Sequence, residues 1–201
     1  MYKCKMNCIK VIKICTLTAL VILLSNNLTT ANEGGAFDKT LTLNGINFHI
    51  TCPNEGSLNT LTIVPSGLSI ENPVITEEID GSVTGAQIDD LNGDGSPEVY
   101  VYINSAGSGS YGSLVAYGSN NNKSISTIYL PPLEDDKKNS KGYMGHDKFN
   151  IADSELRRQF PIYKQNDTNA NPSGGVRQLQ YKLFAGEAGW QLKLTGSTLL
   201  Q

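Results

Sequence analysis

The sequence of 201 residues is poor in cysteine, and its few cysteines are unevenly placed. Three of the four, Cys4, Cys8 and Cys15, lie near the N-terminus, so the remainder of the chain holds only Cys52. This excludes an internal disulfide in that part, and it also excludes a metal site built on several cysteines. Cys52 is expected to be a small buried hydrophobe. A bridge to a second chain is the alternative, which leaves a homodimer open.

The apolar run near the N-terminus is too short to cross a bilayer comfortably, because residues 14–24 give it only eleven residues. Four lysines and no acidic residue precede it (residues 1–13), and Thr29 and Ala31 follow at the small-residue positions of a cleavage site. That order is typical of a secretory signal peptide, and a membrane anchor is the alternative. We therefore expect residues 1–31 to be removed and residues 32–201 to form one β-rich domain.

Positive charge is also scarce once the signal peptide is gone. The mature chain keeps 12 basic and 19 acidic residues, which gives a formal charge of −7. An acidic surface disfavours nucleic acids and anionic membranes and favours basic protein partners. We expect an exported protein that binds no nucleic acid and no membrane after cleavage.

Long segments with helical periodicity are lacking, although a helical turn over Ile75–Ile79 is left open. Short alternating or β-branched segments dominate, and clusters of Gly, Asn, Pro and Ser separate them. The predicted strands are Thr40–Leu43, Asn47–Thr51, Leu58–Val64, Leu68–Ile70, Glu98–Ile103, Ser113–Tyr117, Ile125–Leu130, Lys148–Ile151, Leu156–Tyr163, Arg177–Phe184 and Trp190–Leu194. This pattern predicts an all-β fold, a single antiparallel β-sandwich or barrel-like domain.

Sequence signatures of catalysis are absent. No serine lies in a G-x-S-x-G elbow, and no histidines show the H-E-x-x-H spacing of a zinc site. The mature chain has two histidines, His49 in an alternating strand and His146 beside Asp147. A secreted hydrolase stays a rival, because a Ser-His-acid triad is assembled in space rather than in sequence. We nevertheless expect a protein that is not an enzyme.

The segment Ser105–Gly112 (SAGSGSYG) follows the strand Glu98–Ile103 directly. It matches the pattern G-x-G-x-x-G, but a dinucleotide site needs a helix next, and Ser113–Tyr117 reads as another strand. The segment is therefore interpreted as a loop between two strands. An ordinary flexible hairpin loop is one reading of it.

The composition of this loop favours a binding role. Gly107 and Gly109 give the backbone freedom to project, and Ser108 and Ser110 offer hydroxyl groups. Tyr111 adds a flat ring and a phenolic hydroxyl with few torsions to freeze. Such a loop is suited to insertion into a polar cleft of a partner.

The segment Asp90–Glu98 (DLNGDGSPE) resembles a calcium loop of the D-x-[DN]-x-D-G type. The candidate oxygen ligands are Asp90, Asn92, Asp94 and Glu98. Pro97 interrupts the pattern early, and the twelfth position is Val101 rather than a bidentate Glu. The alternative is an Asx-rich turn. We expect a structural turn with at most weak calcium binding, and we expect no other cofactor.

Four segments, DDLNGDGSPEVYVY, SAGSGSYGSLVAY, SKGYMGHD and GEAGW, occur in one order and together resemble the periplasmic lysozyme-inhibitor family directed at invertebrate-type (i-type) lysozymes. The resemblance runs from about Thr40 to Leu194 and is less clear around Thr51–Leu58. It implies an antiparallel β protein of the Gram-negative periplasm whose partner is an i-type lysozyme. A calcium-dependent carbohydrate- or surface-binding β module is the alternative function.

The resemblance also implies site residues. Inhibitors of this kind place a Ser-Gly loop over the two catalytic carboxylates of the lysozyme, and Ser108 and Tyr111 occupy the matching positions. Ser110 and the Gly107–Gly109 backbone would support them. Hydroxyl groups suit this task, because they donate to an ionised carboxylate and accept from a protonated one.

The family further implies mutual insertion, in which a segment of the lysozyme enters a pocket on the inhibitor. Tyr143, His146 and Arg177 are the candidates for this second contact region.

Overall fold

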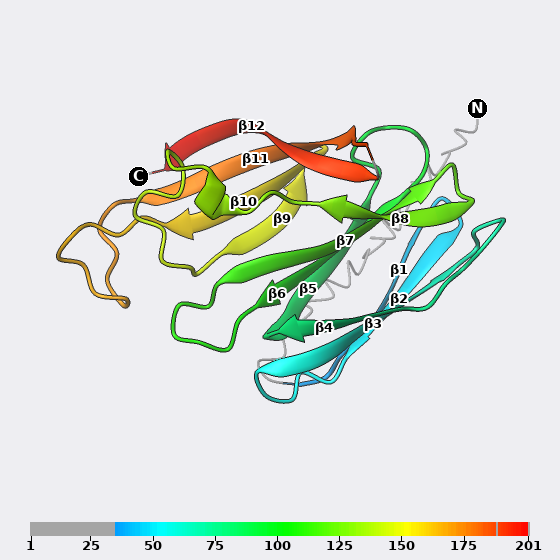
Figure 1. Ribbon diagram of the computed structural model, residues 1–201, viewed down its shortest axis with the longest axis horizontal. Coiled ribbons are helices and arrows are strands. Elements are labelled where there is room, and N and C mark those ends of the chain that lie inside the picture. Colours follow the sequence, from blue (N-terminus) through cyan, green and yellow to red (C-terminus); the bar gives the residue numbers. More distant parts are fainter. Residues whose placement is uncertain (1–34, 188, 201) are drawn as a thin grey trace, which may run out of the picture. The chain divides into compact units, whose positions relative to one another are not determined.

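The computed structural model describes residues 35–187 and 189–200, and the predicted signal peptide, residues 1–31, lies outside this range. The regular secondary structure of the described part is almost entirely β-strand, as the sequence predicted (Figure 1). It has one short 3-10 turn, Leu133–Asp135. Within the described residues, no helix has the length and apolarity that crossing a membrane would require.

The first sheet is antiparallel and has four strands in sequence order. They are β1 (Phe37–Leu43), β2 (Ile46–Cys52), β3 (Leu58–Ser66) and β4 (Ile75–Asp80). The turn between β1 and β2 is Asn44–Gly45, where both residues have positive φ, as the predicted hairpin requires.

The second sheet has eight strands in the order β5-β6-β7-β8-β12-β11-β10-β9. They are β5 (Ser82–Asp89), β6 (Glu98–Asn104), β7 (Gly112–Asn120), β8 (Ser124–Tyr129), β9 (Lys148–Ala152), β10 (Glu155–Pro161), β11 (Val176–Ala185) and β12 (Trp190–Leu200). All neighbours pair antiparallel except β8 and β12, which run parallel for two residue pairs.

The two edge strands of this sheet, β5 and β9, approach each other and almost close it into a barrel. The backbone N–H of Ile151 on β9 donates to the side chain of Gln87 on β5 at 2.9 Å. The rings of Tyr102 and Phe149 stack at 5.8 Å between centroids. The architecture is thus a four-stranded sheet and a nearly closed barrel-like sheet.

Strand β6 is buried on both faces and separates two hydrophobic cores. Val99, Val101 and Ile103 point into the core shared with the first sheet, while Tyr100 and Tyr102 point into the barrel-like sheet. Alternation of side chains along a strand explains this division. The loop that follows β6 therefore starts from the most deeply packed strand of the molecule.

Three local predictions were wrong. Ile75–Ile79 is part of strand β4 rather than a helical turn, Leu68–Ile70 is a bend rather than a strand, and strand β5 was missed. A register shift between Val83 and Gly85 interrupts the alternation of β5, which hid its pattern. Cys52 is buried in the first core, as expected for a small hydrophobe.

Candidate functional site

The loop between β6 and β7 is closed by its own hydrogen bonds. The N–H of Ser105 donates to the carbonyl of Tyr111 at 2.9 Å, and the N–H of Tyr111 donates to Oγ of Ser105 at 3.0 Å. Within the loop, the N–H of Ser110 donates to the carbonyl of Gly107 at 2.9 Å. Three hydrogen bonds within the segment thus hold the loop in the shape that the structure shows.

A second segment, residues 142–147, packs against the loop. The N–H of His146 donates to the carbonyl of Gly109 at 2.7 Å. Gly145 has a φ of +89°, and a Cβ there would lie 1.9 Å from the carbonyl oxygen of Gly109. The ring of Tyr111 packs edge-on against Tyr143, with 5.6 Å between centroids. Only glycine at position 145 permits this close contact of the two segments.

A third segment contributes Asn169, which sequence reasoning did not identify. Its Nδ2 donates to the carbonyl of Ser108 at 2.7 Å, and its Oδ1 lies 3.1 Å from Nε2 of His146. The hydroxyl of Tyr163 donates to the carbonyl of Asn169 at 3.0 Å. The amide of Asn169 thus links the tip of the loop to His146.

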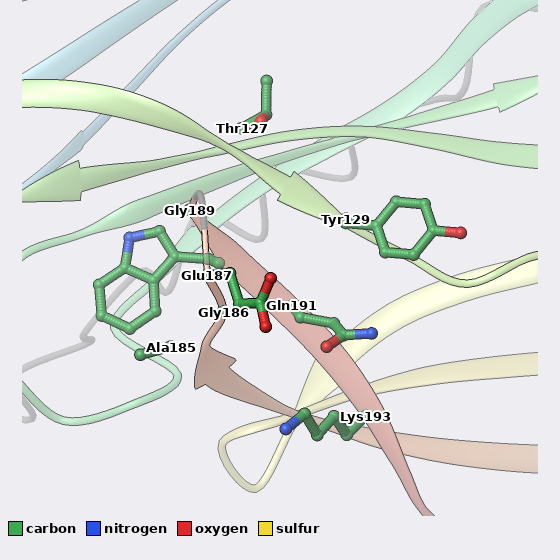
Figure 2. Close-up of a pocket in the computed structure, with 9 residues that line it drawn as sticks. Thr127, Tyr129, Ala185, Gly186, Glu187, Gly189, Gln191 and Lys193 are labelled. Carbon is green, nitrogen blue, oxygen red and sulfur yellow. The ribbon is translucent and has the colours of Figure 1, made fainter.

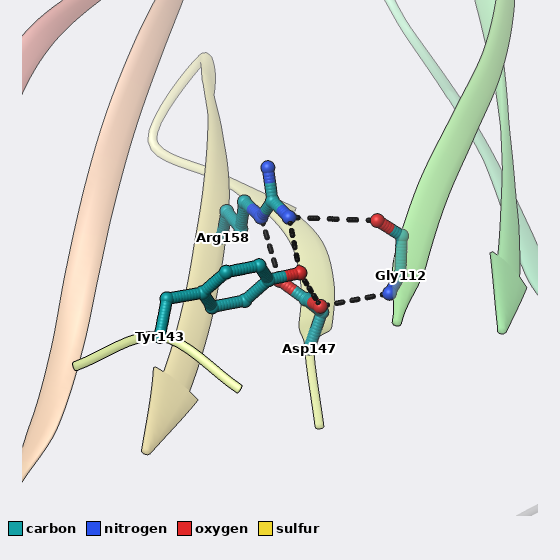
Figure 3. Close-up of polar contacts among 4 residues, drawn as sticks. All are labelled: Gly112, Tyr143, Asp147 and Arg158. Carbon is teal, nitrogen blue, oxygen red and sulfur yellow. Dashed lines mark hydrogen bonds and ion pairs between the residues drawn. The ribbon is translucent and has the colours of Figure 1, made fainter. Parts of the chain in front are cut away.

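The loop ends on a buried polar network (Figure 3). Asp147 accepts from Nε of Arg158 at 2.6 Å, from the hydroxyl of Tyr143 at 2.5 Å and from the N–H of Gly112 at 2.7 Å. Arg158 also donates through Nη2 to the hydroxyl of Tyr143 at 2.8 Å. Gly112 is the last residue of the loop and the first of β7, so the network fixes the end from which Tyr111 projects.

The charged pair in this network is deeply buried, with side-chain exposures of 7% for Arg158 and 0% for Asp147. Burial lowers the pKa of Arg158, but the neighbouring Asp147 carboxylate outweighs that effect, and the net pKa is raised. The guanidinium also lies over the rings of Tyr143, Phe149 and Phe160 at 5.2, 5.4 and 5.8 Å. A buried charge is tolerated when it is paired and hydrogen-bonded in this way.

The five loop residues predicted to bind the partner, residues 107–111, lie at the tip of this assembly. Ser108 and Gly107 are exposed, Tyr111 is 50% exposed, and Ser110 and Gly109 are half-buried. Burial raises the pKa of Tyr143, so its hydroxyl remains a protonated donor to Asp147 at neutral pH. Exposed hydroxyl groups therefore project from a base that is held by buried bonds.

A pocket of about 600 Å³ adjoins the loop. Tyr111, Tyr143 and Arg158 line it on one side, and Leu130, Pro131, Pro132 and Glu134 line it on the other. Its walls combine aromatic and aliphatic surface with two charged groups. Tyr143, predicted as a second contact residue, thus faces both the loop and the pocket.

The structure does not bring Arg177 to this site. Its Nη1 donates to Asn139 at 3.1 Å and to Ser197 at 3.2 Å. Nor do His146 and Asp147 form the acid-histidine pair of a hydrolase triad. The ring of His146 is hydrogen-bonded to Asn169. Both carboxylate oxygens of Asp147 already accept hydrogen bonds, from Arg158, Tyr143 and Gly112.

The Asp90–Glu98 segment forms a turn between β5 and β6. Both carboxylate oxygens of Asp90 accept backbone N–H groups, from Asp94 at 3.0 Å and from Gly95 at 2.8 Å. Asn92 Oδ1 also accepts from the N–H of Asp94 at 3.0 Å. These are the bonds of an Asx-rich turn.

Carboxylate oxygens of Asp90, Asp94 and Glu98 nevertheless come within 4.8 Å of one another. Glu98 is 1% exposed, and its burial raises its pKa to about 8. The hydrogen bond from the N–H of Leu91 lowers this pKa, while the nearby acidic residues raise it further. The predicted oxygen ligands are therefore together, with Asn92 beside them through a 2.9 Å bond from its Nδ2 to Asp94.

Fold and site together define an all-β protein that presents a rigid, hydroxyl-bearing loop on a buried anchor, which is the architecture of a binding protein. The family model described as periplasmic lysozyme inhibitor of I-type lysozyme matches residues 75–141. The match confirms the family resemblance over these residues, about a third of the chain, and its range includes the whole Ser105–Gly112 loop but not the GEAGW segment. It supports a periplasmic lysozyme inhibitor. No curated protein and no solved structure matches the chain.

Proposed function

We propose that this protein inhibits an i-type lysozyme by inserting the Ser105–Gly112 loop into the active-site cleft of the enzyme. The main support for the proposal is that the loop exposes its central residues while its last residue is hydrogen-bonded to a buried carboxylate. Tyr111 is 50% exposed, while the residue after it donates its N–H to the fully buried carboxylate of Asp147. A loop that is already ordered loses little conformational entropy on binding.

The chemistry of the tip suits a glycosidase. A retaining glycosidase holds a carboxylate nucleophile and a protonated carboxylic acid about 5 Å apart. The hydroxyl groups of Ser108 and Tyr111 can donate to the former and accept from the latter. A loop that satisfies both groups would exclude the sugar chain from the cleft.

The pocket beside Tyr111 is suited to the reverse insertion, in which a segment of the lysozyme enters the inhibitor. Its lining combines Tyr143 and Arg158 with the apolar side chains of Leu130, Pro131 and Pro132. Asp147 already neutralises Arg158, so an uncharged segment with an apolar side chain and a carbonyl acceptor fits the pocket best. The acidic mature chain would speed encounter with a basic lysozyme.

A calcium-dependent carbohydrate- or surface-binding module is the second candidate, favoured by the convergence of Asp90, Asp94 and Glu98. Its binding activity should depend on calcium, whereas lysozyme inhibition should survive a chelator.

The experiment that tests the proposal compares inhibition of i-, c- and g-type lysozymes by the purified mature protein, with and without EDTA. We expect inhibition of the i-type enzyme, little or none of the other two, and no effect of EDTA. Absence of i-type inhibition would refute the proposal and favour the calcium-dependent candidate.

A further inference from the structure

The described residues of the GEAGW segment, Gly186, Glu187, Gly189 and Trp190, lie away from the inhibitory loop, at the hairpin between β11 and β12. A pocket of about 780 Å³ opens there, beside the two residue pairs where β8 and β12 run parallel (Figure 2). Trp190 is fixed at its edge, because its Nε1 donates to Asn120 at 3.1 Å. The lysozyme proposal assigns no role to this surface.

Three side chains form a row across one face of the sheet, and two of them, Tyr129 and Gln191, line this pocket. Gln191 on β12 pairs in register with Tyr129 on β8 and with Phe184 on β11. Residues paired in this way point to the same face, and Figure 2 shows Tyr129 and Gln191 extending in the same direction. Tyr129 is 54% exposed and Phe184 is 43% exposed. The row therefore presents two exposed rings on either side of one amide.

Polar groups surround the row. Lys193 follows on the same face of β12, with its ammonium 5.4 Å from the centre of the Phe184 ring. Thr127 precedes Tyr129 on β8, and Glu187 stands on the hairpin. The pocket thus offers hydrogen-bond donors, acceptors and aromatic faces together.

This combination narrows the class of ligand. Protein interfaces likewise combine an aromatic centre with a polar rim, but they impose no fixed spacing between two rings. Sugars instead present apolar C–H faces that pack on aromatic rings, together with hydroxyl and acetamido groups that need donors and acceptors. The backbones at Tyr129 and Phe184 are two strand spacings apart, or about 9.6 Å. That separation is close to the repeat of two sugars in an extended β-1,4-linked chain.

We infer that this face binds an extended β-1,4-linked chain of N-acetylated sugars. Alternate sugars pack on Tyr129 and Phe184, while Gln191 and Lys193 donate to acetamido carbonyls and hydroxyls and Glu187 accepts from acetamido N–H groups. The inference stands apart from the lysozyme proposal, because it uses none of the residues of the inhibitory loop. A sugar chain of this chemistry is also what a lysozyme cleaves, so the site would hold an inhibitor beside the polymer that it protects.

The test is an NMR titration of the isotope-labelled mature protein with the tetramer of N-acetylglucosamine, with the tetramer of glucose as a second probe. We expect shift changes centred on Tyr129, Phe184 and Gln191, with a Kd of about 0.1–1 mM for the acetylated probe. The glucose tetramer should bind more weakly, because it lacks the acetamido groups.

Two variants and one matched control locate the site. Y129A should weaken binding about tenfold or more, and K193E, which keeps the aromatic row, should weaken it by a smaller factor. Y111A removes an equally exposed tyrosine outside the face and should bind the sugar as wild type does, while Y129A should inhibit lysozyme as wild type does.

Three outcomes would overturn the inference. They are no shift changes at about 10 mM probe, shift changes that map to the Ser105–Gly112 loop, and equal losses of sugar binding in Y111A and Y129A. Sedimentation provides a further check. A wild-type dimer that Y129A dissociates would make this face a contact between two copies of the chain and would likewise refute sugar binding.

Discussion

Asp147 and Arg158 form an ion pair inside the protein, with 2.6 Å between Oδ1 and Nε, and the same carboxylate accepts the N–H of Gly112 at 2.7 Å. One buried pair thus holds the end of the loop that carries Tyr111. The pair thus connects strand β10 and the segment just before β9 with the end of a loop 35 residues earlier in the sequence. It explains how a loop rich in glycine and serine keeps one conformation.

The first prediction concerns this pair. Asp147→Asn leaves the Arg158 charge buried without a counter-charge, so the free energy of unfolding should fall by about 3–5 kcal/mol. Denaturant unfolding measures it. Asp153→Asn is the matched control, because Asp153 is 81% exposed in its pair with Arg157, and an exposed pair contributes about 1 kcal/mol or less. Equal effects of the two substitutions would contradict the anchoring role of Asp147.

The second prediction concerns the contact between the loop and its support. Gly145→Ala places a Cβ against the Gly109 carbonyl at a φ of +89°, so it should displace the loop and weaken lysozyme inhibition. Strain at such a position costs on the order of 1–3 kcal/mol. Gly107→Ala is the control for stability, because no heavy atom lies within 4 Å of a Cβ there. Thermal melts and inhibition titrations check both variants. A fully active Gly145→Ala protein would argue against a fixed loop.

The sequence predicted the parts of the fold whose signals are local. The strand Glu98–Ile103 and the Asn44–Gly45 turn are where their residue types placed them. Ile75 and Ile79 are four residues apart, a spacing that also fits a helix, and only pairing with β3 makes this segment a strand. The parallel contact of β8 with β12 joins segments about 60 residues apart, and the local sequence of neither segment indicates it.

The candidate site was predictable in its exposed part and not in its anchor. Sequence motifs identified Tyr111, Tyr143 and His146 as candidates. They did not show that Asp147 pairs with Arg158, which lies on β10, a strand that begins eight residues after Asp147. One signal was nevertheless present. Arg158 lies in phase with the buried residues Leu156 and Phe160 on β10, so strand periodicity puts its side chain inside the barrel-like sheet. A charged residue in that phase requires a buried partner.

The third prediction concerns the pH dependence of stability. Burial raises the pKa of Glu98 to about 8 from its ordinary 4.5, so the folded state binds this proton more tightly than the unfolded state. The stability contributed by Glu98 should therefore be complete below its unfolded pKa and be lost as the pH rises through about 8. Unfolding in EDTA at pH 5 and pH 8 should show a smaller pH effect in Glu98→Gln than in wild type. Glu78→Gln, at an exposed position, should behave as wild type. Identical pH effects in all three proteins would contradict the assignment.

The fourth prediction concerns calcium. The Asp90–Glu98 turn is held by its own backbone bonds and lacks a bidentate ligand at the twelfth position. EDTA should leave the thermal midpoint unchanged, and added calcium should raise it only at concentrations of about 0.1–1 mM or above. Asp94→Asn should remove that rise. An ion that survives chelation and is detected by elemental analysis would show that the turn is a tight site instead.

The central claim is that the exposed hydroxyl groups of the loop inhibit the lysozyme. Truncating a central interface tyrosine costs about 2 kcal/mol or more, and a buried carboxylate that loses its hydroxyl partner costs about 1–3 kcal/mol. Tyr111→Ala and Ser108→Ala should therefore each weaken inhibition by about tenfold to a few hundredfold. Ser108 is exposed, so Ser108→Ala should change stability by about 0.5 kcal/mol or less. Tyr111→Ala also removes the edge-on contact with Tyr143, so its free energy of unfolding should fall by about 0.5–1.5 kcal/mol.

The measurement that tests this claim most directly is an inhibition titration of i-type lysozyme with wild type, Tyr111→Ala and Ser108→Ala, each paired with a thermal melt. The account predicts an unchanged melt for Ser108→Ala, a small decrease for Tyr111→Ala and a loss of inhibition in both variants. Folded variants with undiminished inhibition would contradict it, because the loop would then not be the inhibitory element.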